Sequence, residues 1–172
     1  KNISWFFKDY VATDEIIDYK ITNVQKKGDS LLVTIKNKTK NGMPVSLYGL
    51  HKQEVVYKTW IEQVYDKKTV AIPALNISRV ALNYDGVIPE INQRDNYKGV
   101  GTLLDKPLQL RLLKDVEDPR FTQIFFMPEV QFNLYDGISF GPKLYNQTLL
   151  KKNFEYQIVP LYGTKSKTFV GG

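Results

Sequence analysis

The chain has 172 residues, no cysteine and a formal net charge of +6, a length that suits one large domain or two small ones. Its hydrophobic (42%) and aromatic (13%) contents exclude a disordered tail. The lack of cysteine excludes disulfides, thiolate metal sites and cysteine nucleophiles.

Residues 1–15 are expected to form the helical tail of a preceding domain. In SWFFKDYVATDE, a helix would place Trp5, Phe6 and Tyr10 near one face, and Asp14 and Glu15 then form a polar break. So short a helix has little to stabilise it alone.

From residue 16 the period of the apolar side chains changes to two, which predicts strands. Ile17, Tyr19 and Ile21 alternate with polar neighbours, and a glycine-containing turn separates this run from a second one, as in a β-hairpin. Several short strands at regular spacing predict an immunoglobulin-like β-sandwich module over residues 16–86. The expected strands are residues 16–24, 31–38, 44–50, 54–64, 68–74 and 78–84.

Residues 87–107 are rich in Asp, Asn, Gly and Pro and show no sustained period. Such composition predicts an irregular connection. We therefore expect a linker here, with the domain boundary inside it.

Residues 108–172 are expected to form antiparallel strands of about ten residues with one apolar face. The even positions from Ile124 to Leu134, and again from Ile138 to Leu144, are apolar, while many odd positions are polar. A soluble sheet with one buried face gives this alternation, and so does a truncated outer-membrane barrel, whose strands face lipid. In the second case Tyr135 and Tyr162, near turns, would suit an interfacial aromatic girdle.

No catalytic, cofactor-binding or metal-binding residue emerges from the sequence. His51, the one histidine, falls in an expected turn, and metal sites usually need several ligands in fixed spacing. Two acidic groups could act as calcium ligands, and the first of them also as glycosidase acids. Solvated turns are the simpler interpretation of both. These groups are Asp115, Glu117 and Asp118, and Asp85, Glu90 and Asp95.

Three aromatic side chains in expected strands could bind a glycan or a protein partner, namely Tyr48, Tyr57 and Trp60. Burial in a core is the alternative for Trp60. The lysines are scattered among turns and form no continuous stripe along which a phosphate backbone could bind, so no nucleic-acid partner is expected.

The chain resembles the C-terminal, non-catalytic region of aminopeptidase N-like (gluzincin) metallopeptidases, in the version found in large envelope proteins of Bacteroidetes. The resemblance lies in Trp5-Phe6-Phe7 with Tyr10, in GDSLLVTIKNK, MPVSLYGL, VVYKTWIE and RVALNYDGVIPEINQRDN, and in the strands FFMPEVQFNLYDGISFGPKLYN and EYQIVPLYGTKSK. In that family the W-F-F motif closes the helical part of the catalytic domain, a β-sandwich follows, and the last strands resemble the start of an outer-membrane barrel.

The resemblance implies that the zinc ligands and the general base of such a parent lie upstream of this chain, and no position here matches them. It implies a non-enzymatic scaffolding and anchoring region in the cell envelope, periplasm or outer membrane, with an upstream peptidase-like domain and outer-membrane lipid as partners and no cofactor of its own. An independent β-sandwich binding module for glycan or protein partners is the alternative.

Overall fold

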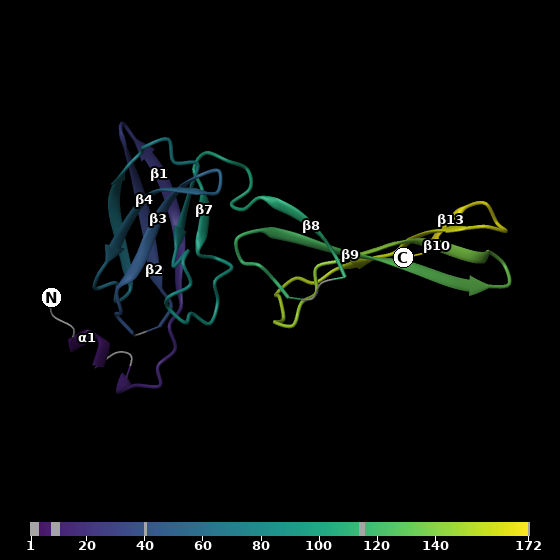
Figure 1. Cartoon of the computed structure of the whole chain (residues 1–172), viewed down its shortest axis with the longest axis horizontal. Coiled ribbons are helices and arrows are strands. Elements are labelled where there is room, and N and C mark those ends of the chain that lie inside the picture. The colour runs from purple at the N-terminus through teal and green to yellow at the C-terminus, as the bar shows by residue number, and fades with distance from the viewer. Residues whose placement is uncertain (1–3, 8–10, 40, 114–115, 172) are drawn as a thin grey trace. The chain divides into compact units, whose positions relative to one another are not determined.

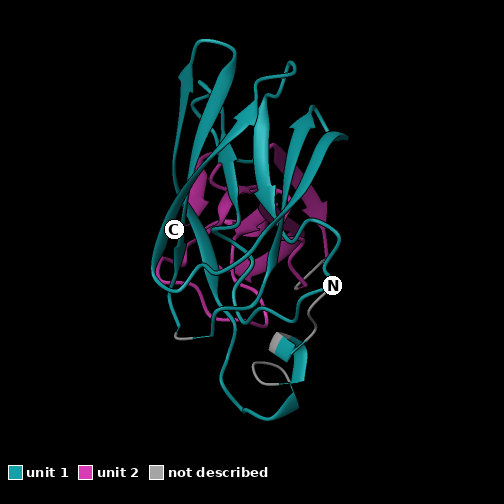
Figure 2. Ribbon diagram, turned by 90° about the vertical axis from the view of Figure 1, so that its left-hand side faces the viewer, with its two compact units in different colours: residues 1–106 teal, residues 107–172 magenta. Residues whose placement is uncertain are grey.

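The computed structural model describes residues 4–7, 11–39, 41–113 and 116–171. Two compact units emerge, Lys1–Lys106 and Pro107–Gly172, which Figure 2 colours separately. The described elements are almost all strands, so the all-β prediction is confirmed.

The predicted N-terminal helical tail is described only in part. Helix α1 (Ser4–Phe6) has three residues, and residues 12–16 carry no regular structure. Tyr10, expected on the helix face, lies outside the described residues. Among the described residues of 1–15, the α-helix covers Ser4–Phe6, and so short a helix has little stability by itself.

The first unit is a sandwich of two antiparallel sheets (Figure 1). One sheet has the order β1-β2-β5 and the other the order β4-β3-β6-β7. This is an immunoglobulin-like strand order, with the fourth strand in the second sheet. The bounds are β1 (Tyr19–Lys27), β2 (Ser30–Asn37), β3 (Val45–His51), β4 (Glu54–Ile61), β5 (Lys67–Pro73), β6 (Arg79–Leu82) and β7 (Tyr97–Gly99).

The core of this unit lies between the two sheets, because alternate residues of both point inward. Tyr19, Val33 and Ile35 come from the first sheet, and Leu47 and Val80 from the second; all five are fully buried. The alternation visible in the sequence thus sets which face of each strand is covered.

The segment expected to be a linker, residues 87–107, instead folds into the first unit as far as residue 106. Strand β7 pairs with β6, and Ile88 and Tyr97 are buried. Residue 88 is not in a strand, and the Asn83 side chain satisfies its backbone: it accepts from the Ile88 N–H group and donates to the Ile88 carbonyl. Side-chain hydrogen bonds of this kind can hold an irregular segment in place although its apolar residues follow no period in the sequence.

The second unit is one sheet of order β13-β12-β10-β9-β8, with β11 pairing with β10 as well. Its longest pair is the β9–β10 hairpin (Figure 1). The bounds are β8 (Leu108–Leu112), β9 (Thr122–Asn133), β10 (Gly137–Tyr145), β11 (Gln157–Ile158), β12 (Pro160–Gly163) and β13 (Phe169–Gly171).

The pairing of β8 differs from the antiparallel arrangement expected after residue 107. It runs parallel to β9, with Leu108 opposite Thr122 and Leu112 opposite Phe126. The connection between Leu112 and Thr122 returns the chain to the starting end of β8, as a parallel pair requires.

Candidate functional site

The sheet of the second unit exposes its apolar face. On β9 and β10 the even-numbered side chains Val130 (69% exposed), Phe132 (73%), Ile138 (53%) and Phe140 (52%) are open. The leucines of β8, at positions 108, 110 and 112, are exposed as well. A contiguous apolar surface of this kind marks an interaction site rather than an ordinary exterior.

The opposite face of the same sheet is polar and partly covered. Gln123 and Ser139 are buried, and Gly141 lies so close to β12 that an added Cβ would meet the Pro160 carbonyl oxygen. Large apolar side chains thus lie on the open face of this sheet, whereas a soluble sheet covers most of them. Two apolar side chains are buried on the other face: Phe125, which packs against Tyr145, and Leu161 of β12.

Aromatic rings form a row across three strands on the exposed side. The Tyr162 ring lies 6.3 Å from Phe140 and 5.7 Å from Phe169, both edge-on. Tyr135, in the turn between β9 and β10, is 89% exposed. The two tyrosines predicted for an aromatic girdle, Tyr135 and Tyr162, are therefore both accessible, and Tyr162 belongs to the row.

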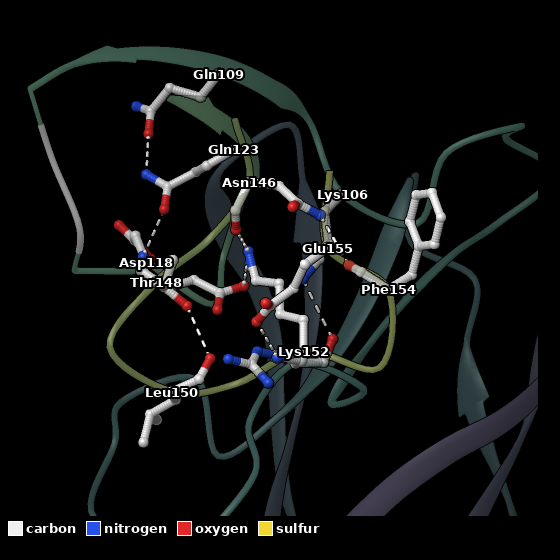
Figure 3. Close-up of polar contacts among 12 residues, drawn as sticks. Lys106, Gln109, Asp118, Gln123, Asn146, Thr148, Leu150, Lys152, Phe154 and Glu155 are labelled. Atoms are coloured by element: carbon white, nitrogen blue, oxygen red, sulfur yellow. Dashed lines mark hydrogen bonds and ion pairs between the residues drawn. The ribbon is translucent and has the colours of Figure 1, made fainter. Parts of the chain in front are cut away.

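A polar cluster supports one end of the sheet (Figure 3). Gln123 lies between two partners: its Nε2 donates to Gln109 Oε1 (2.7 Å), and its Oε1 accepts from the Asp118 N–H group (2.7 Å). Lys152 donates to the Asn146 carbonyl oxygen (2.8 Å) and lies 5.9 Å from the centre of the Phe125 ring. The cluster fastens residues 116–121 and 146–156 to the sheet.

The acidic group weighed for glycoside chemistry is held by cations. Glu117 forms an ion pair with Lys152 (3.6 Å), with both side chains about 85% covered, and Asp118 forms hydrogen bonds with Arg120. The Arg120 side chain, more than the opposing burial, lowers the pKa of Asp118. Asp115 lies outside the described residues. Glu117 and Asp118 therefore hold their loop in place through these cations.

The other acidic group is dispersed, and each member has its own partner. Asp95 forms an ion pair with Lys38 (2.6 Å), while Asp85 forms one with Lys58 (3.2 Å). Glu90 accepts from the Tyr19 N–H group and from the amides of Asn83 and Asn96. Within the described ranges, no group of three or more histidine or acidic side chains could hold a metal ion.

Glu90 holds a buried hydrogen-bond network, whereas the sequence suggested for it only a possible role as a calcium ligand. Burial raises the pKa of its carboxyl, against the lowering by its three donors. The Oδ1 atom of Asn96, whose amide donates to Glu90 over 2.6 Å, is buried without a hydrogen-bond partner in the described part of the chain. The arrangement ties β1 to the 83–96 segment.

Two of the three aromatic residues proposed for binding are not free platforms. Tyr48 is 3% exposed and its hydroxyl donates to Asp85; burial and this hydrogen bond raise the pKa of Tyr48. Tyr57 packs against the sandwich core. Trp60 is 47% exposed and lies near Lys58, whose ammonium is 5.9 Å from the indole ring.

His51 ends β3, where its Nδ1 lies 2.9 Å from the Asn76 carbonyl oxygen.

No helix in the described part of the chain is both long enough and apolar enough to cross a membrane. Comparisons with protein-family models, curated proteins and solved structures gave no match.

Proposed function

We propose that this chain is a non-catalytic anchoring region of a larger cell-envelope protein, in which the sheet of the second unit contacts outer-membrane lipid. The observation that carries the proposal is which side chains of β9 and β10 are exposed. The apolar Val130, Phe132 and Phe140 are open, while the polar Gln123 and Ser139 are covered. Apolar side chains outside and polar ones inside is the arrangement of strands that face lipid.

The dimensions support the same conclusion. Strand β9 has twelve residues and β10 has nine, and a strand that crosses a bilayer needs about nine to eleven. In water each exposed phenylalanine forgoes about 1.5–3 kcal/mol that burial would provide. Acyl chains recover this energy without any change in the sheet.

The first unit then has a supporting role. Several of its polar groups hold the sandwich together, as Glu90 does for β1 and Asp85 for Tyr48. By its resemblance to the region that follows the catalytic domain of aminopeptidase N-like metallopeptidases, it would pack against an upstream peptidase-like domain. The parent's zinc chemistry would belong to that domain.

Flotation with lipid vesicles tests the anchoring function. The full chain and a chain of residues 1–106, which has its own core, are each mixed with vesicles and centrifuged through a density gradient. We expect the full chain to float with the lipid and residues 1–106 to stay at the bottom. Equal behaviour of the two chains would contradict the proposal.

A second function, a β-sandwich module that binds a glycan, is favoured by one observation, the half-exposed indole of Trp60 beside Lys58. Aromatic faces stack on sugar rings, and a nearby ammonium can donate to hydroxyls. Saturable glycan binding by a detergent-free monomer, lost in Trp60→Ala, would support this function; absence of saturation would reject it.

A further inference from the structure

The outer edge of β9 is open beyond Phe126. Strand β8 pairs with β9 only from Thr122 to Phe126, where the Leu113 N–H group donates to the Phe126 carbonyl oxygen. In the described part of the chain, no strand pairs with this side of β9 over residues 127–133. The open stretch is therefore a strand edge with unpaired backbone groups.

The register shows which residues face this edge. Because the Phe126 carbonyl points toward β8 and the β9–β10 ladder has no bulge, the even residues of β9 direct their backbone groups outward. Pro128 lies opposite Pro142 in that ladder, and neither has an N–H group to give. The residues of this stretch that offer both an N–H and a C=O group are thus Val130 and Phe132, while Pro128 offers its C=O group alone.

We propose that this edge pairs with the same edge of a second copy of the chain, antiparallel and centred on Gln131. In that register Val130 of one copy lies opposite Phe132 of the other and exchanges two backbone hydrogen bonds with it. The two-fold axis repeats the exchange, which makes four bonds in all. The proposal rests on the edge alone and does not require contact with lipid.

The side chains suit this register. It joins the exposed apolar residues of both copies into one continuous face, and it places Gln131 opposite Gln131, whose amides can pair. Glu129 comes to lie opposite Asn133 and not opposite the second Glu129, so no like charges meet. The β8–β9 ladder ends at Phe126 and so does not overlap the stretch from Val130 to Phe132 in which the four bonds would form.

Proline at position 130 tests the backbone bonds. Val130→Pro removes the outward N–H group but no bond of the β9–β10 ladder, while Val130→Thr keeps the N–H group and the branched shape. Both are measured by sedimentation velocity in a non-ionic detergent, which suppresses association through the apolar face. We expect wild type and Val130→Thr at twice the 19.9 kDa chain mass and Val130→Pro at the single mass.

Charge at position 131 tests the register and does not depend on how the proline variant folds. Gln131→Glu and Gln131→Lys each place like charges across the two-fold axis, so each alone should dissociate at least tenfold more readily than wild type. An equal mixture should restore dimers containing one of each. A monomeric wild type, a dimeric Val130→Pro variant, or a mixture without restoration would overturn the proposal, whatever the result of vesicle flotation.

Discussion

At the scale of single residues, Glu90 is the group whose protonation should affect stability most visibly. Its carboxyl is largely buried among amides, and burial raises its pKa above the ordinary glutamate value of 4.5. The folded chain then binds more protons than the unfolded chain between pH 4.5 and the raised pKa. The stabilisation that comes from protonated Glu90 is complete below this window and is lost as the pH rises through it.

The Glu90→Gln variant should therefore lose this pH dependence. We expect the free energy of unfolding of wild type, relative to that of the variant, to decrease as the pH is raised from 4.5 to 7. Urea unfolding at several pH values measures it. The same substitution at the exposed Glu54 is the matched control, and a wild type that gains relative stability with rising pH would show that the sign is wrong.

Two neighbouring inward positions of β10 should respond to alanine in opposite directions. At Gly141 a Cβ would lie 2.0 Å from the Pro160 carbonyl oxygen, so Gly141→Ala should destabilise the second unit by about 1–3 kcal/mol. Ser139 carries a buried Oγ without a partner among the described residues, so Ser139→Ala should be neutral or stabilising by about 1 kcal/mol.

Guanidinium unfolding of the two variants measures both effects. Destabilisation by Ser139→Ala as large as that by Gly141→Ala would mean that the hydroxyl has a partner and that the close approach of β12 to β10 is not the cause.

At the scale of elements, the Glu117–Lys152 ion pair fastens the 146–156 segment to the sheet. Lys152→Met should cost about 2 kcal/mol, less than the 3–5 kcal/mol of a fully buried pair, because both side chains retain some exposure. Adding Glu117→Leu should recover much of the loss, since the carboxylate that Lys152 faced is then absent as well. A double-mutant cycle from urea unfolding gives the coupling, and additive effects would contradict it.

The strands that the sequence predicted are those in which local period and burial agree. Tyr19, Val33 and Leu47 lie on alternating runs and are buried in the core, so period two was sufficient to find β1, β2 and β3. Segment 87–106 was predicted as a linker because its only strand, β7, has three residues, and because side-chain to backbone bonds such as those of Asn83 with Ile88 leave no period in the sequence.

Within the second unit the alternation identified the two faces but not their environments. Phe125 is an apolar residue at an odd position, and only the structure reveals that it fills the polar face against Tyr145. The parallel pairing of β8 depends on the end of that strand to which the chain returns before Thr122, and no local residue type encodes that. The partners of Glu90 and Glu117 are distant in sequence or in loops, and were not predictable for the same reason.

At the scale of the whole molecule, the two units differ in how they satisfy their apolar residues. The first buries them between its own sheets, as Val33 and Leu47 are buried. The second leaves Val130, Phe132 and Phe140 exposed, and the side chains that it buries include the polar Gln123 and Ser139. In our account the second unit obtains its apolar environment from lipid, while the first provides the folded support.

The most direct test of this account is a cysteine scan of residues 129–133 and 138–141 in vesicles. The chain has no native cysteine, so each variant carries one nitroxide label, and its collisions with oxygen, which dissolves in lipid, are compared with those of a polar reagent. The account predicts oxygen maxima at Val130, Phe132, Ile138 and Phe140, alternating with minima at the odd positions. Maxima at the odd positions, or no alternation, would contradict contact between this face and lipid.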